Sequence, residues 1–283
     1  MPEFDRFYLG ILASVVTSCF INIRVMLARP KLFSTRAGVA HFLSNIFALA
    51  AGLNLTLNES LQNDACTLEL GFGCAFVHAS KLLNHLILFW RCNAVTNHHP
   101  FVRYGFYILV AFKMAAVSSH CALMQPFYDA ISKLCLDKLE PISTTLTFAL
   151  DMSVDLSLTT LFMVKIYDQV RENGRYTYGP AVRMRRLFRE YIYETVPMLV
   201  ISMCLNGIII SNVLKDYTLI LIYTDLILQL RLTNDLIVLN RLADDSSSSI
   251  NGSSFHKEQS SLPKSNFHSN LSVEDFIRAS TSL

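Results

Sequence analysis

Seven of the polar or ionisable residues that lie inside apolar stretches of this chain could do chemistry, and such side chains are uncommon there. They are Lys81, Asn84, His85, Lys113, Asp151, Asp155 and Asp225. A charged residue in the middle of a membrane-crossing helix costs about 3 kcal/mol and usually marks a ligand site, an ion pathway or a structural ion pair. We therefore take all seven as candidate ligand-binding residues.

The spacing of these residues predicts which helical faces carry them. His78, Lys81 and His85 are spaced i, i+3, i+7, so they share one face of a helix, with Asn84 alongside. Lipid cannot solvate that face, so we expect it to turn toward other helices.

The segment LDMSVD places Asp151 and Asp155 at i, i+4, again on one face. The simplest pairing sets Lys81 or Lys113 against one of these two carboxylates or against Asp225. Two interpretations stay open at this point. The ion pairs could serve only to fix helix packing, or the same groups could line a pocket for a polar ligand.

Enzymatic and metal-dependent functions find little support. A DxxxD pair on a membrane helix can hold Mg²⁺ against a phosphate, but the Asp-Gly and Ala-Arg segments that accompany it in lipid phosphotransferases are missing. No GxSxG-like serine turn occurs, and no lysine in the last apolar stretch could hold retinal. A membrane zinc hydrolase would need several histidines that converge from different helices. His41, His78, His85 and His120 lie in apolar stretches, but none of them lies in the last three. We expect no enzyme activity, metal or cofactor.

The composition places these residues in a helical membrane protein. The chain has 283 residues, of which 52% are hydrophobic and only 16% are charged, whereas soluble domains average about 25% charged residues. The apolar residues gather in runs long enough to cross a bilayer as helices, without the alternation of barrel strands. The predicted class is all-α, a polytopic bundle surrounded by lipid.

Seven crossings are predicted within a membrane domain of residues 1–242. Their ranges are 7–27, 38–57, 70–90, 104–124, 143–166, 191–214 and 217–239. Arg231, Asn234 and Asp235 interrupt the last range, so six crossings and a surface helix form the alternative. Residues 243–283 are rich in serine and poor in aliphatic residues, which predicts a disordered tail.

Arginine and lysine collect in the first, third and fifth loops, while the second and sixth hold only Lys215 between them. This bias predicts that the odd-numbered loops and the tail are cytoplasmic and that the N-terminus is outside. The glycosylation sequon at Asn58 then lies outside, in the second loop.

The stretch from Cys66 to Arg91 is similar to the third helix of rhodopsin-like G-protein-coupled receptors. In that family a cysteine begins the helix and an arginine ends it, with the same separation of 25 residues. Asn22 and Val25 also resemble the family's Asn-x-x-Val motif of the first helix. The resemblance implies a disulfide between Cys66 and Cys135, in the loop after the fourth helix, and a cytoplasmic position for Arg91.

Other family motifs are altered in this chain. Trp90 and Cys92 flank Arg91 where the family has aspartate and tyrosine, and Asn45 stands where an aspartate is usual. TVPMLVISMC contains Pro197 without the family's Cys-Trp before it, and TNDLIVL replaces Asn-Pro-x-x-Tyr. The resemblance therefore covers topology and one helix rather than the activation motifs.

These features predict a plasma-membrane receptor that binds an extracellular ligand among its last five helices and signals to a G protein or another cytoplasmic protein. We expect no nucleic-acid partner. The residues predicted to couple to the cytoplasmic partner are Arg91, Arg183, Arg185, Arg186 and Arg189. A transporter or proton-linked carrier that uses the same lysine, aspartate and histidine residues is the main alternative. A membrane adaptor that works through its tail is another.

Overall fold

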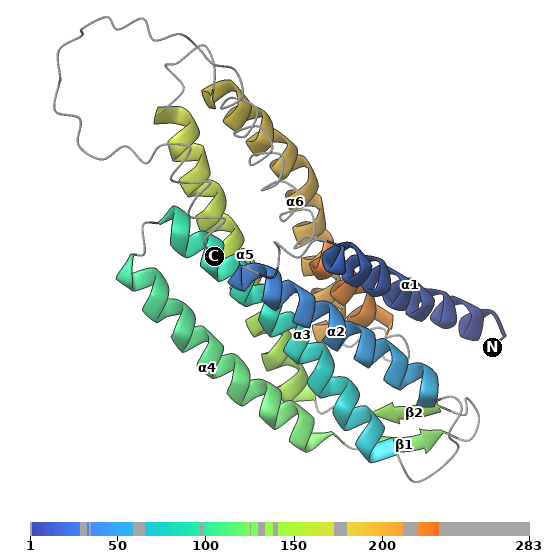
Figure 1. Ribbon diagram of the computed structural model, residues 1–283. Helices are drawn as coiled ribbons and strands as arrows, with labels where there is room; N and C mark the ends of the chain where they lie inside the picture. The colour runs from blue at the N-terminus through green and yellow to red at the C-terminus, as the bar shows by residue number, and fades with distance from the viewer. Residues whose placement is uncertain are drawn as a thin grey trace, which may run out of the picture.

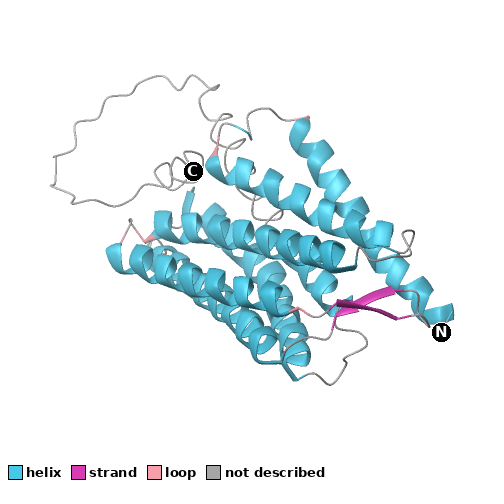
Figure 2. Ribbon diagram, turned by 90° about the horizontal axis from the view of Figure 1, so that it is seen from below, coloured by secondary structure: helices cyan, strands magenta, loops and turns pink. Residues whose placement is uncertain are grey.

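The computed structural model of the protein is a helical bundle with one short hairpin (Figures 1 and 2). It describes residues 2–28, 33, 35–58, 66–96, 99–124, 126–129, 134–137, 141–172, 180–211 and 220–231. The elements are α1 (Pro2–Leu27), α2 (Arg36–Asn58), α3 (Cys66–Val95), α4 (Pro100–Leu123), β1 (Pro126–Asp129), β2 (Leu134–Asp137), α5 (Pro141–Glu172) and α6 (Pro180–Ser211). Residues 220–231 form a further helical segment, which makes seven helices in the described part of the chain.

Local sequence signals explain where several helices begin. Four helices start at a proline, namely Pro2, Pro100, Pro141 and Pro180. Proline suits a first helical position because its φ angle is already helical and its missing N–H would have no partner there. α2 begins differently, with the Thr35 hydroxyl accepting a hydrogen bond of 3.0 Å from the backbone N–H of Gly38.

α3 occupies the centre of the bundle. It contacts α2, α4 and α5, and the antiparallel hairpin of β1 and β2 also contacts it near its first residues (Figure 1). α1 packs on α2, and α6 packs on α5. A side chain that points inward from the middle of α3 can therefore reach several other helices.

Two apolar clusters hold this arrangement together. The first joins α1, α2 and α3 to the 220–231 segment, and its fully buried members include Val15, Ala48 and Leu226. The second joins α3, α4 and α5, where the rings of Phe89 and Phe106 stack with centroids 4.0 Å apart. The polar residues described below lie on the same helices as these two clusters.

The distribution of polarity is that of a membrane protein. Phe20 on α1 and Phe112 on α4 are 64% and 63% exposed, whereas Lys81 and Asp151 are fully buried. Such a surface would be an aggregation hazard in water but suits contact with lipid. Within the described residues, five helices are long and apolar enough to cross a membrane: Gly10–Leu27, Arg36–Asn54, Leu70–Asn93, Pro100–Leu123 and Ile142–Asp168.

The first five predicted crossings agree with these spans to within a few residues at each end. α6 covers the sixth, but only Thr195–Ser211 is apolar, and its first half is an extension rich in arginine. The seventh is helical over residues 220–231, and residues 232–239 lie outside the described part, as does the tail. The helical class is confirmed, and the hairpin in the fourth loop was not predicted.

Candidate functional site

Lys81, in the middle of α3, is fully buried and binds aspartates from two other helices. Its Nζ lies 2.6 Å from Oδ2 of Asp225 and 3.4 Å from Oδ2 of Asp151. The same ammonium lies 5.0 Å from the ring centroid of Phe148, in a cation–π arrangement. Asp151 and Phe148 are on α5 and Asp225 is in the 220–231 segment, so one ammonium group ties three helices together.

Asp225 also binds α6. Its Oδ1 accepts hydrogen bonds from the Ser202 hydroxyl and from the side-chain amide of Asn206, the latter at 3.2 Å. Ser202 and Asn206 are one turn apart and therefore share a face of α6. Our sequence analysis did not single them out. The available signal was a pair of polar residues at i, i+4 in the apolar second half of the helix, Thr195–Ser211.

The second half of the network runs from α4 to α3 and back to α5. Nζ of Lys113 lies 2.5 Å from Oδ1 of Asp151 and 2.8 Å from Nδ1 of His85. Nε2 of His85 lies 2.9 Å from Oδ1 of Asp155. The amide of Gln229 donates a hydrogen bond of 3.0 Å to the other oxygen of Asp155, and Gln229 is also a residue that the sequence analysis missed.

These contacts form one continuous chain of charged and polar groups through the bundle. Asp151 is its branch point, because one carboxylate oxygen faces Lys81 and the other faces Lys113. The predicted pairing of buried lysines with aspartates is therefore present for Asp151 and Asp225. Asp155, the third candidate, pairs with His85 instead. As expected from their spacing, Asp151 and Asp155 point into the bundle from one face of α5.

The network carries unequal charge. It contains three carboxylates and two lysine side chains, and Lys113 forms a hydrogen bond of 2.8 Å with Nδ1 of His85. If a charged Lys113 is the donor, Nδ1 of His85 is the acceptor, so the imidazole ring is neutral and its Nε2 faces Asp155. The chain then has one net negative charge, and one added proton or one cation would neutralise it.

The same contacts argue against the magnesium interpretation of the DxxxD segment. Asp151 is bound to both lysines, and Asp155 is bound to His85 and Gln229. A divalent cation between the two carboxylates would have to displace cations that the protein itself supplies. What the arrangement offers chemically is charge recognition and, at the hydrogen bond between Lys113 and His85, proton transfer.

Asn84 faces α2 rather than the lysines. Its Oδ1 accepts a hydrogen bond of 2.9 Å from Ser44, whose hydroxyl also lies 2.9 Å from that of Ser80. On another face of α2, which packs against α1, the Asn22 side-chain amide donates a hydrogen bond of 3.0 Å to Oδ1 of Asn45. The two asparagines that we compared with family motifs are thus in contact. The ligand-binding role of Asn84 stays a prediction.

The residues predicted to couple to a partner lie on two helices. Arg91 is in the last turns of α3 and is 8% exposed. Arg183, Arg185, Arg186 and Arg189 belong to the first half of α6 rather than to a loop. At 3.6 residues per turn these four positions span about 160° of the helix, so they share one side of it. Arg189 is exposed, and the side chains of the other three lie outside the described part.

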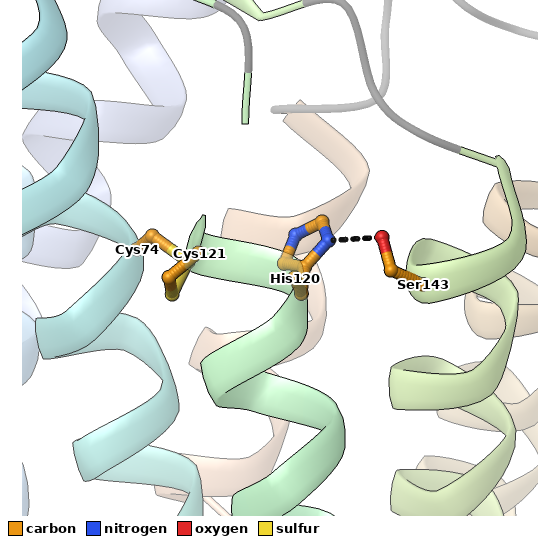
Figure 3. Close-up of a disulfide and its surroundings, with 4 residues drawn as sticks. All are labelled: Cys74, His120, Cys121 and Ser143. Atoms are coloured by element: carbon orange, nitrogen blue, oxygen red, sulfur yellow. Dashed lines mark hydrogen bonds between the residues drawn. A yellow bond between two sulfur atoms is a disulfide. The ribbon is translucent and has the colours of Figure 1, made fainter. Parts of the chain in front are cut away.

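The predicted disulfide and glycosylation site also involve side chains outside the described part. Cys66 is the first residue of α3, and Cys135 is in β2 of the hairpin that contacts α3. Asn58 is the last residue of α2. A different disulfide, which the sequence analysis missed, joins Cys74 of α3 to Cys121 of α4 (Figure 3).

In comparisons with known proteins, no family model, curated protein or solved structure matches this chain. The resemblance to rhodopsin-like receptors consequently rests on the residues named above. The fold itself defines a helical membrane protein with a buried chain of ion pairs.

Proposed function

We propose that this chain is a seven-helix membrane receptor in which the buried ion pairs hold an inactive arrangement that an extracellular ligand releases. The observation that carries the proposal is the binding of Lys81 to both Asp225 and Asp151 at the centre of the bundle. That contact joins α3 to α5 and to the 220–231 segment. Through Ser202, it also reaches α6.

Energetics favour a functional role for this network. Burying ions costs several kcal/mol for each, and apolar side chains of similar volume often hold a core together equally well or better. A protein that needed only packing would have little use for five buried charges. Charged groups retained inside a membrane bundle are by default a functional site.

The proposed orientation places the N-terminus outside and the tail in the cytoplasm. The distribution of arginine and lysine among the loops supports it. The Cys74–Cys121 disulfide adds support, because it joins the first half of α3 to the end of α4, the ends assigned to the exterior. Disulfides persist in oxidising compartments, and the cytoplasm is reducing.

Ligand action follows from competition for charge. A ligand with an acidic group could replace Asp225 as the partner of Lys81, which would release the 220–231 segment and α6 from α3. A ligand shifts such an equilibrium only by its difference in affinity for the two arrangements. The arginine side of α6 is continuous with the helix that carries Ser202, so a movement of α6 would reach a cytoplasmic partner directly.

The test is guanine-nucleotide exchange on G proteins reconstituted with the purified receptor and challenged with pools of extracellular ligands. We expect Asp225→Asn to raise exchange without ligand, because it weakens the bond between α3 and the 220–231 segment. Arg91→Ala should abolish exchange. Lys165→Ala and Arg103→Ala are the matched controls, because both replace exposed basic residues on neighbouring helices. Exchange that is indifferent to Asp225→Asn and to Arg91→Ala would overturn the receptor proposal.

The second half of the network favours one alternative, a proton-linked carrier. Lys113 forms a hydrogen bond with Nδ1 of His85, and Nε2 of His85 lies 2.9 Å from Asp155, so the three side chains form a series of close contacts along which a proton could pass between helices. A carrier predicts substrate flux in vesicles that contain no G protein, and His85→Ala should stop that flux. A receptor predicts no such flux from the wild type.

A further inference from the structure

Two cysteines and two histidines lie together at the end of the bundle that contains the hairpin. Cys74 and His78 are one turn apart on α3, and His120 and Cys121 are adjacent on α4. The cysteines form the disulfide, with Cα atoms 6.4 Å apart, and the His120 ring lies beside it, directed toward Ser143 of α5 (Figure 3).

The donor atoms of this cluster are close enough for one metal ion. Ligand atoms of Cys74, His78 and His120 all lie within 4.8 Å of one another. Ligands of a tetrahedral zinc ion, at about 2.0–2.3 Å from the metal, are about 3.5 Å apart. Side-chain movements of about 1 Å would bring the three donors to that spacing.

His78 gives an independent indication of a ligand. Its side chain is 6% exposed, and its buried Nδ1 has no hydrogen-bond partner among the described residues. A buried polar atom without a partner costs about 1–3 kcal/mol, so such atoms call for an explanation. The ring faces that of His120 edge-on, with centroids 5.8 Å apart. His120 is itself oriented by Ser143, whose Oγ lies 3.4 Å from its Nδ1.

We propose that reduction of the Cys74–Cys121 disulfide opens a Zn²⁺ site formed by Cys74, His78, His120 and Cys121. Two cysteines and two histidines are a usual ligand set for structural zinc. Cys121 supplies the fourth ligand because its sulfur starts one bond away from that of Cys74. The disulfide and the zinc site exclude each other, since both need the same two sulfur atoms.

The chemistry balances with a dithiol as the reductant. Its two thiols give up two electrons and two protons and become a disulfide, while the Cys74–Cys121 bond breaks to give two thiols. Zinc binding then releases the two thiol protons as the thiolates coordinate the metal. Either state holds α3 and α4 together, and the zinc state also binds a ring nitrogen of His78.

The site also lies next to the ion-pair network. The ring of Phe148 contacts both His78, at 6.5 Å between centroids, and the ammonium of Lys81. His78 and Lys81 are also one turn apart on α3. A metal that repositions His78 would therefore act on the environment of Lys81, which gives the redox state of the exterior a route to the central network.

The test measures metal binding to the full-length protein in detergent. The protein is reduced with a phosphine, which becomes a phosphine oxide and does not compete strongly for zinc, and is then titrated with Zn²⁺ or Co²⁺. We expect one ion per chain after reduction and none before it. Bound Co²⁺ should show the near-ultraviolet thiolate band and the strong visible bands of a tetrahedral site.

Variants decide whether the named residues hold the ion. His78→Ala and His120→Ala each remove one ligand and should weaken binding at least about tenfold, the loss expected even for residues that only support a ligand. Cys204→Ser and His99→Ala are the matched controls, because they remove an exposed free cysteine and an exposed histidine outside the cluster.

Both histidine variants keep the disulfide, so they remain informative even if Cys74→Ser fails to fold. Equal binding by oxidised and reduced protein would overturn the proposal, as would full binding by the histidine variants. The outcome does not depend on whether the protein is a receptor or a carrier.

Discussion

Replacing Lys81 by methionine tests the central ion pair most directly. At an effective dielectric constant of about 20, contacts of 2.6 Å and 3.4 Å correspond to attractions of about 6 and 5 kcal/mol. Most of this offsets the desolvation of the ions. Removing one partner of a buried pair nevertheless costs about 3–5 kcal/mol, because the remaining charge is left without compensation. We expect Lys81→Met to lower the free energy of unfolding by that amount.

The double variant Lys81→Met/Asp225→Asn isolates the electrostatic part of this loss. Asparagine keeps an acceptor for Ser202 and Asn206 and restores the net charge of the network to its wild-type value. We expect it to recover about 2 kcal/mol or more relative to Lys81→Met alone, as a coupling energy between contacting residues. Lys165→Met, at an exposed position of α5, is the control.

The assay is reversible unfolding in mixed micelles of increasing denaturing detergent, followed by the fluorescence of the single tryptophan, Trp90. A loss for Lys81→Met no larger than that for Lys165→Met would refute the reasoning. So would a further loss, rather than a recovery, when Asp225→Asn is added to Lys81→Met.

The remaining predictions concern the exterior and the tail. Mass spectrometry of unreduced peptides should find Cys66 linked to Cys135, and a free thiol at either position would contradict the family resemblance. Asn58→Gln should remove the glycosidase-sensitive part of the apparent mass, whereas Asn251→Gln should leave it unchanged because the tail is expected inside. Protease added to intact cells should leave an epitope within residues 245–283 uncut, and cleavage there would invert the topology.

The pairing of buried lysines with aspartates could be predicted from the sequence because an unpaired charge inside a membrane bundle is energetically costly. Lysine and aspartate residues inside apolar runs have few stable positions other than facing one another. Helical spacing then fixed which side of α5 carries Asp151 and Asp155. The five spans followed from apolar length alone, which is why they agree to within a few residues.

The choice of partners could not be read from the sequence. From the sequence alone, Lys81 could pair with any of three aspartates. The packing of α3 against α5 and the 220–231 segment selects Asp225 and Asp151. Uncharged partners were harder to find, because glutamine, serine and asparagine are tolerated in membrane helices for many reasons. Gln229 and Ser202 were missed on that account.

The Cys74–Cys121 disulfide was missed for a different reason. The family resemblance implied a disulfide between Cys66 and Cys135. Cys74 lies near the start of α3 and Cys121 near the end of α4, and these two ends are adjacent because the helices are consecutive and antiparallel. A neighbouring pair of helices brings such positions close whatever the family. The similar distance of Cys74 and Cys121 from the exterior ends of their predicted spans could therefore have indicated this disulfide.

Asp151 determines how the two halves of the network depend on each other. Its carboxylate contacts both Lys81 and Lys113. If one of these lysines moves away, the carboxylate attracts the remaining lysine more strongly, because its negative charge is less compensated. If a ligand takes Lys81 from Asp225, that lysine can move away from Asp151, and Asp151 is then left to Lys113. The stronger attraction between Asp151 and Lys113 favours Lys113 as the donor in its hydrogen bond with His85. Ligand binding and proton position are thus linked through one side chain. By this linkage a receptor built on the network would respond to pH, and a carrier built on it would couple substrate to protons.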